Sequence, residues 1–298
     1  MKLEIKNLSK TYGNGVRALK SVDLSIGTGM FGLLGQNGAG KSSLMRTIAT
    51  LQDADQGSIR FKNIDVFQEP GELRKVLGYL PQEFGLYPSA TAEEMLLYLA
   101  DLKGIATLKQ RRQQVEMLLH KVNLHEKRNQ RLGTYSGGMK QRFGIAQALL
   151  GDPKLVIVDE PTAGLDPTER NRFYNLLSEI GSSITVILST HIVEDVYTLC
   201  NDMAIIGDGK VLLSGVPRKV EESLQGRCWV KSIERNELEH YTTNLNVIAN
   251  HFHLGQMNIT VVQDEAPEDG FKAKKPTLED AYFNTLAQQK ELVSQHLK

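Results

Sequence analysis

The chain has 298 residues, 41% of them hydrophobic and 23% charged, and its formal net charge at pH 7 is zero. These values are ordinary for a soluble globular protein, and a net charge of zero gives no excess of basic residues to indicate nucleic-acid binding. The two cysteines, Cys200 and Cys228, lie far apart without ligand-like spacing, so we expect reduced thiols in a cytosolic protein. No apolar run approaches the roughly 18 residues that span a bilayer, and the N-terminus lacks the apolar core of a signal peptide. A role at the membrane would therefore come through a partner.

The first eighty residues show strand-like patterning. Polar and apolar residues alternate with a period of two over residues 2–8 and 19–26, which indicates antiparallel strands. An apolar run covers residues 30–35, and alternation returns over residues 57–67. We expect a further strand at residues 74–80, which a proline ends.

The pattern then changes to helical spacing. Apolar side chains within residues 91–123 form two helical faces. The residues of these faces are Met95, Leu96, Leu99 and Leu102, and Val115, Leu118, Leu119 and Val122. This spacing predicts a helical insert at about residues 84–150. Its last helix is expected to start near Gly138 and to stop at residues 151–153, which contain a glycine and a proline.

The next segment has the order strand, helix, strand. Residues 154–160 and 183–191 are largely apolar strands, and residues 168–180 between them read as a helix. Strands that are apolar on both faces indicate a parallel sheet covered by helices, so the fold class is α/β. Residues 202–215 read as a hairpin turned at an Asp-Gly pair.

The patterning weakens after Pro217, where we place a domain boundary. Residues 1–217 would form the first domain, and residues 218–298 a small C-terminal extension. The extension contains possible strands at residues 228–233 and 257–263 and a final helix from Thr277. Thr277 and Asp280 have the spacing of a capping box.

Residues Gly35 to Ser42 carry a phosphate-loop motif. They match G-x-x-x-x-G-K-[ST] and lie between an apolar strand and a helix, as the motif requires. Glycines let successive backbone N–H groups turn toward phosphates, and the helix N-terminus adds partial positive charge. Lys41 would reach the outer phosphates, and the Ser42 hydroxyl would ligate Mg²⁺. The alternative is a glycine-rich turn with an accidental lysine, which chance produces in on the order of 1% of such chains.

Two acids and a histidine follow the apolar strands. Asp159 and Glu160 end the first strand, and His191 ends the second. Each has an ordinary structural interpretation, as a strand-end charge or a structural histidine. Beside a phosphate loop, however, Asp159 would hold Mg²⁺ through its water shell, and Glu160 would orient or deprotonate the attacking water. His191 lies where open α/β folds bind ligands, and we expect it to contact the γ-phosphate.

A second glycine turn, Ser136 to Gly138, opens the helix at residues 139–150. The ordinary interpretation is a serine cap with a tight turn. Two glycines are nevertheless costly at a simple cap, and they expose backbone N–H groups to an anion. Reaching the γ-phosphate from the helical insert of the same chain is awkward. A head-to-tail pair of chains would let each turn serve the partner's ATP.

The ordered set of motifs along residues 1–217 resembles the ATP-binding-cassette (ABC) ATPases, the nucleotide-binding subunits of ABC transporters. The resemblance implies a P-loop NTPase fold with a RecA-like mixed-sheet core, an N-terminal antiparallel β subdomain and a helical subdomain, followed here by a small α+β extension. It implies that Tyr12 stacks on adenine, that Gln82 senses Mg²⁺ and couples to a membrane partner, and that Asp166 in residues 163–167 contacts a second cassette.

The resemblance also implies ATP and Mg²⁺ as cofactors and a set of site residues. The expected ATP-binding residues are Tyr12, Gly35, Asn37, Gly38, Ala39, Gly40, Lys41, Ser42 and Ser43; the catalytic residues are Lys41, Glu160 and His191; the metal-binding residues are Ser42, Gln82 and Asp159; the signature residues are Ser136, Gly137 and Gly138; and the dimer-loop residue is Asp166. The signature begins with Tyr135 where the family usually has leucine, and serines replace common threonines after Lys41. A hydroxyl is retained at the magnesium position, so we expect catalysis to survive.

The implied partners are a separate polytopic membrane subunit and a second ATPase subunit, expected as a homodimer in the ATP state, with no nucleic acid. The chain would be cytoplasmic and peripheral on the inner face of the cell membrane. Residues 84–105 and 276–286 resemble ATPases of drug, antibiotic-peptide or lipid exporters. Two alternatives stay open. One is a non-transport ABC ATPase acting on a cytosolic or nucleic-acid complex, and the other is a nucleotide sensor that dimerises without turnover.

Overall fold

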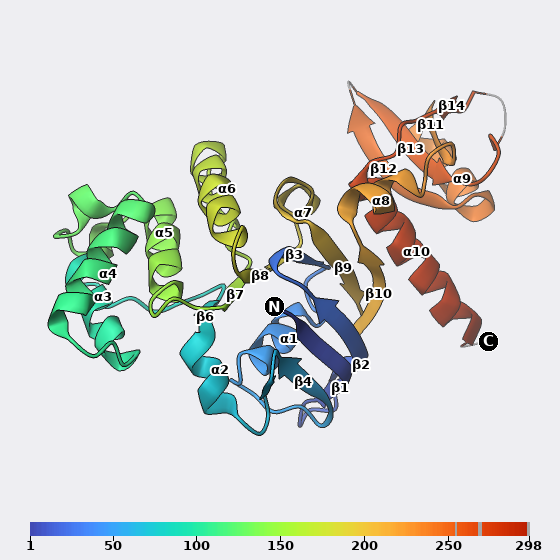
Figure 1. The fold of residues 1–298 in the computed structure, drawn as a ribbon. Helices are drawn as coiled ribbons and strands as arrows, with labels where there is room; N and C mark the ends of the chain where they lie inside the picture. The colour runs from blue at the N-terminus through green and yellow to red at the C-terminus, as the bar shows by residue number, and fades with distance from the viewer. Residues whose placement is uncertain (254, 268–269, 297–298) are drawn as a thin grey trace. The chain divides into compact units, whose positions relative to one another are not determined.

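The computed structural model describes residues 1–253, 255–267 and 270–296 (Figure 1). The chain forms two compact units. The first consists of Met1–Asn201 and Ile206–Val211, and the second of Asp202–Ile205 and Leu212–Lys298. Among the described residues, no helix combines the length and apolar character needed to cross a bilayer. Both cysteines are buried and free of disulfides.

An antiparallel sheet forms the N-terminal part of the first unit. Its strands are β1 (Leu3–Thr11), β2 (Arg17–Ile26), β4 (Gln56–Phe61) and β5 (Ile64–Asp65), in the order β2-β1-β4-β5. Ile5 pairs with Leu24 on one side and with Ile59 on the other. The predicted antiparallel strands are confirmed, since the period-two alternation places the apolar side chains on the buried face of the sheet.

A second sheet has six strands. Its strands are β3 (Gly29–Leu34), β6 (Leu77–Leu80), β7 (Leu155–Asp159), β8 (Thr185–Thr190), β9 (Asp202–Gly207) and β10 (Lys210–Gly215), in the order β10-β9-β3-β8-β7-β6. The pairs β3–β8, β7–β8 and β6–β7 are parallel. Leu34 therefore lies beside Thr190, and Asp159 beside Ser189, so three carboxyl ends meet at one edge. The predicted buried parallel sheet and the α/β class are confirmed.

Four helices accompany these two sheets. They are α1 (Lys41–Ile48), α2 (Pro70–Val76), α6 (Pro167–Gly181) and α7 (Val193–Leu199). The prediction of a strand over residues 74–80 is wrong in its first half, because α2 runs to Val76 and only Leu77–Leu80 is a strand. Pro70 at the first helical position, an acid in the first turn and bases in the last favour the helix over the short alternation.

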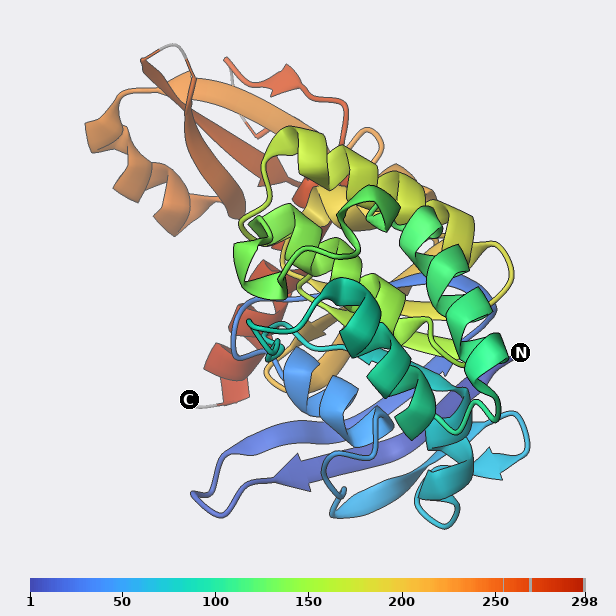
Figure 2. The ribbon, with the colours of Figure 1, turned by 90° about the vertical axis from the view of Figure 1, so that its left-hand side faces the viewer.

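The helical insert contains three longer helices and two short ones (Figure 2). They are α3 (Ala92–Leu102), α4 (Leu108–Lys121), η1 (His125–Lys127), η2 (Leu132–Thr134) and α5 (Gly137–Ala148). Residues 91–123 thus form two helices, each opened by a capping box, with left-handed Gly104 between them. The face around Leu118 is buried as predicted. The other face ends early, because Leu102 is 67% exposed.

The second unit contains a small antiparallel sheet with helices. Its elements are α8 (Pro217–Glu222), β11 (Cys228–Ile233), η3 (Arg235–Glu237), α9 (Leu238–Asn244), β12 (Val247–His253), β13 (Gln256–Val262), β14 (Lys272–Ala273) and α10 (Leu278–His296). The strand order is β12-β13-β11-β14. Ile233, Tyr241 and Ile259 belong to its core. The two predicted strands and the final helix, with the Thr277 and Asp280 cap, are confirmed, whereas β12 and α9 were not predicted.

Candidate functional site

The phosphate loop connects β3 to α1, and its shape depends on glycine. Gly38 and Gly40 adopt left-handed φ angles of 81° and 108°. A Cβ on Gly40 would lie 2.5 Å from the carbonyl oxygen of Ala18, so any side chain there would also collide with the backbone. The sequence therefore folds into a loop whose N–H groups precede the N-terminus of α1, an arrangement suited to binding an anion.

Lys41 is the first residue of α1, and its side chain folds back over this loop. Nζ donates hydrogen bonds to the carbonyl oxygens of Gly35 at 2.7 Å and Gln36 at 3.2 Å. It also lies 3.1 Å from Oε1 of Glu160. Lys41 is 5% exposed, so its ammonium group is held at the loop, where it can pair with a bound phosphate.

A pocket of about 530 Å³ opens in front of the loop. Its size is within the range of small-molecule and cofactor sites. The predicted site residues that line it are Tyr12, Asn37, Gly38, Gly40, Lys41, Ser42, Ser43, Gln82 and Glu160. Gly35, Ala39 and Asp159 are buried and are not among its lining residues. Asp208 and Gly209, which turn the β9–β10 hairpin, also line the pocket and were not predicted.

Glu160 contacts both other predicted catalytic residues. It follows β7, its N–H donates to the Ser189 carbonyl at 2.8 Å, and its φ is 50°. A left-handed φ is uncommon for a residue with a side chain and often accompanies a functional site. One carboxylate oxygen faces Lys41 and the other is hydrogen-bonded to Nδ1 of His191. The structure thus brings Lys41, Glu160 and His191 together from the ends of β3, β7 and β8.

Asp159 is 3% exposed, and within the described chain its Oδ1 has no hydrogen-bond partner. Burial raises the pKa of Asp159, and the neighbouring Ser189 and Ser42 hydroxyls only partly offset that rise. A buried carboxylate oxygen with spare acceptor capacity, close to a serine hydroxyl, is the hard oxygen environment that Mg²⁺ prefers. The residues present therefore fit a magnesium ion.

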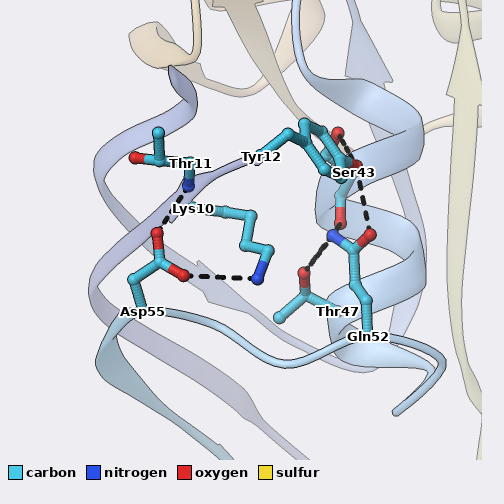
Figure 3. A network of polar contacts seen from close by, with 7 residues as sticks. All are labelled: Lys10, Thr11, Tyr12, Ser43, Thr47, Gln52 and Asp55. Atoms are coloured by element: carbon cyan, nitrogen blue, oxygen red, sulfur yellow. Dashed lines mark hydrogen bonds and ion pairs between the residues drawn. The ribbon is translucent and has the colours of Figure 1, made fainter. Parts of the chain in front are cut away.

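Tyr12 is held against the start of α1 by a polar network (Figure 3). Its hydroxyl lies 2.9 Å from Oγ of Ser43 and donates to Gln52 at 3.1 Å. Gln52 in turn donates to the Ser43 carbonyl and to Thr47, each at 2.9 Å. The network fixes Tyr12 at the wall of the pocket, while its stacking on adenine stays a prediction. Gln52 was missed, because no local pattern marks it.

A second polar network, around Asp195, was also missed. Asp195 in α7 is 0% exposed and accepts hydrogen bonds from the hydroxyls of Thr162 and Thr190, each at 2.7 Å, and from Tyr174. It therefore joins the loop after Glu160, the end of β8 and helix α6. The signal in the sequence was an acid on the otherwise apolar face of a helix beginning just after His191.

The signature turn does not join this pocket. Ser136 caps α5 by accepting from the Met139 N–H at 3.2 Å, which is the ordinary interpretation of this serine. Ser136 and Gly137 are exposed, whereas Gly138 is buried against Glu169. As far as the chain is described, none of the three lines the pocket of the phosphate loop. Asp166, the predicted dimer residue, caps α6 by accepting from the Glu169 N–H at 2.9 Å.

Comparisons with known proteins agree with this geometry. The ABC transporter family matches residues 19–163. The chain is 34% identical to the linearmycin resistance ATP-binding protein LnrL of Bacillus subtilis over 75% of its length and 72% of that protein. It is 34% identical to the daunorubicin/doxorubicin resistance ATP-binding protein DrrA of Streptomyces peucetius, covering 74% and 67% of the two chains.

A solved structure shows the same fold. The dimeric bacterial ABC transporter cassette MJ0796 superposes with a TM-score of 0.65 at 28% identity, over 72% of this chain and 98% of that one. The phosphate loop, the paired acids and the histidine lie at the ends of β3, β7 and β8, and the chain belongs to the family of ABC transporter ATP-binding proteins and is an ABC ATPase.

Proposed function

We propose that this ABC ATPase drives export through a separate membrane-spanning partner, and that Lys41, Glu160 and His191 are its catalytic residues. The observation that carries the assignment of these residues is that Glu160 contacts both Lys41 and His191 beside the phosphate loop. An ion pair alone would have an ordinary structural explanation. Lys41 and Glu160 line a pocket of nucleotide size, and His191 contacts Glu160 from the end of a third strand, which favours catalysis.

The proposed roles follow from these contacts. Lys41 exchanges its backbone partners for phosphate oxygens, with the loop N–H groups holding the remaining phosphate charge. Glu160 accepts a proton from the attacking water, and His191 orients Glu160 and contacts the γ-phosphate. Ser42, Gln82 and Asp159 would hold Mg²⁺, which supplies charge neutralisation at the phosphates when bound.

The signature turn would serve the ATP of a second copy. It opens α5 with exposed backbone N–H groups, and it is not among the residues lining its own chain's pocket. A head-to-tail homodimer gives each ATP a phosphate loop from one chain and a signature turn from the other. The dimeric MJ0796 cassette supports this arrangement by analogy.

Mixing two inactive variants tests the paired site. Lys41→Ala removes the phosphate ligand, and Gly137→Glu adds a negative side chain at a position with no atom within 4 Å. Each variant alone is expected to lose turnover. An equal mixture should recover about a quarter of wild-type turnover, because half of the dimers are mixed and each of these has one intact pair. A mixture as inactive as its components contradicts the shared site.

The resistance functions named for LnrL and DrrA support an export direction and a drug-like or antibiotic-like substrate class. We place nucleotide binding in residues 1–217, residues 218–298 as a C-terminal extension, and the chain on the cytoplasmic face of the membrane. Purifying the tagged protein from native cells in a gentle detergent tests this proposal. Co-purification of a polytopic membrane protein supports it, whereas only soluble partners, ribosomes or DNA would overturn it.

A further inference from the structure

We propose that the helical insert contains a binding site for a divalent transition metal, apart from the nucleotide pocket, at the junction of α4 and η1. Its ligands are Glu116, His120 and His125. Glu116 and His120 are four residues apart on α4 and so share one helical face. His125 begins η1, and one ligand atom from each of the three side chains lies within 4.8 Å of the others.

The two imidazoles are stacked. Their ring centroids are 3.7 Å apart and their planes differ by 15°. The stack places the rings side by side, and rotation of the exposed His120 side chain out of it turns a ring nitrogen toward an ion that His125 also binds. One metal ion bound by both rings places a single shared cation there, and the carboxylate of Glu116 balances part of its charge.

The surroundings of both histidines suit a cation. Nδ1 of His125 faces Oε1 of Glu126 at 3.4 Å, which leaves Nε2 for the metal. A carboxylate on the second nitrogen is a recurrent partner of metal-ligating histidines, because it fixes the tautomer and the ring orientation. His120 lies in the last turn of α4, where the helix dipole favours positive charge.

The donor set selects the class of metal. Two imidazoles and one carboxylate are a donor set that Zn²⁺ accepts with one position left for water. Imidazole favours Zn²⁺, Cu²⁺ and Ni²⁺ over Mg²⁺ and Ca²⁺. A tetrahedral ion with ligands at about 2.0–2.2 Å needs ligand atoms about 3.3 Å apart. Glu116 and His120 are exposed and can close this distance by rotating their side chains.

The ion would join the end of α4 to the segment that supports the signature turn. The Tyr135 hydroxyl donates to the Lys127 carbonyl of η1 at 2.9 Å, and Tyr135 directly precedes the turn. Arg142 of α5 donates to the carbonyls of Val122 and Asn123, between α4 and η1, at 3.1 and 3.0 Å. The bound metal therefore stiffens the base on which the turn rests.

Calorimetric titration of the full chain with ZnCl₂, in excess Mg²⁺ and without nucleotide, tests the site. We expect saturable binding of one ion per chain at this site. His120→Ala and His125→Ala should each weaken that binding by at least about tenfold, since the loss of an outer partner alone costs about 10–100-fold. His251→Ala, at an exposed histidine of β12, is the matched control and should change nothing.

Another histidine, His191, contacts the carboxylate of Glu160 near the phosphate loop, so His191→Ala is titrated in parallel. Zinc binding that persists in this variant but weakens in the α4 and η1 variants supports the proposal. Binding that is unchanged by His120→Ala and His125→Ala, or abolished by His191→Ala, overturns it, as does an absence of binding. Glu116→Gln, with thermal melting of every variant, separates ligand loss from misfolding.

Discussion

The chain contains two glycine turns that open helices, and their surroundings differ. The phosphate loop ends at Lys41, which is 5% exposed and contacts Glu160. The signature turn opens α5 with Gly137 exposed, and the acid nearest its second glycine, Glu169, pairs with Arg142 at 3.3 Å. Both turns can offer backbone N–H groups to an anion. Only the first has the proposed catalytic side chains beside it. A glycine turn can thus bind an anion, but neighbouring side chains must supply the catalytic chemistry.

Glu160→Gln should have the largest effect on ATP hydrolysis, because it removes the proposed general base beside the phosphate loop. Hydrolysis is expected to fall by about 10²–10⁴-fold while ATP binding survives. Steady-state turnover and a separate ATP-binding titration measure the two. Glu179→Gln, at an exposed acid paired with Lys121, is the control and should hydrolyse normally. A Glu160→Gln protein with wild-type turnover would disprove the assignment.

Asp195→Ala tests how the acid and histidine are held in place. The change leaves the hydroxyls of Thr162, Thr190 and Tyr174 without their common acceptor, and each unsatisfied buried group costs about 1–3 kcal/mol. After partial relaxation we expect the free energy of unfolding to fall by about 2–5 kcal/mol in a denaturant titration. Tyr174→Phe removes one hydrogen bond and should cost about 1 kcal/mol. Equal losses in the two variants would contradict this network.

Lys41→Met compares cations at the two turns. Hydrogen bonds to charged groups contribute about 1.5–3 kcal/mol, so the dissociation constant for ATP should rise about 10–150-fold. Fluorescent-nucleotide titration of the isolated chain measures it. Lys140→Met alters a cation in the first turn of α5 and should leave that affinity unchanged. Similar losses in both variants would indicate that the signature turn serves its own chain's nucleotide.

Gly138→Ala and Gly137→Ala separate packing from function within the signature turn. A Cβ on Gly138 would lie 2.4 Å from Oε2 of Glu169, which must then leave Arg142, at a cost of about 1–3 kcal/mol of stability. Gly137→Ala meets nothing within 4 Å and should melt at the wild-type temperature or above it. The added methyl group would affect only the proposed contact between this turn and the ATP of the partner chain. We therefore expect reduced turnover without reduced stability. Normal turnover in Gly137→Ala would weaken the proposed role.

Asp159→Asn should show the smallest effect on stability, and in the opposite direction. Burial raises the pKa of Asp159, so its ionised form is less favoured in the folded chain than in the unfolded one. Ionisation therefore lowers stability in full at any pH above the folded pKa, and this loss disappears as the pH falls through the folded pKa to the unfolded one. The asparagine variant should melt higher near neutral pH without nucleotide, while losing Mg²⁺-dependent hydrolysis.

Asp166→Ala removes the cap of α6 and should instead lower the free energy of unfolding by about 0.5–2 kcal/mol.

The errors in the sequence-based prediction have two kinds of cause, local signals that were outweighed and contacts that are distant in the chain. The alternation at residues 74–80 indicated a strand. The proline and the charges at the ends of α2 instead favour a helix over the first half of that segment. The helical face that included Leu102 was extended too far, because the packing partners that end a buried face are distant in the chain. Asp195 carries no motif, and its importance depends on three hydroxyls from three other segments.

The sequence by itself determined the features that depend on neighbouring residues. These are the phosphate loop, the capped helices and the alternating or wholly apolar strands, since φ/ψ preferences, local hydrogen bonds and burial patterns act over a few residues. Only the tertiary structure decided that Glu160 contacts both Lys41 and His191, because the parallel order of β3, β8 and β7 brings their ends to one edge. It also decided that Gly137 faces outward while Gly138 is packed, since helix α6 approaches one glycine and not the other.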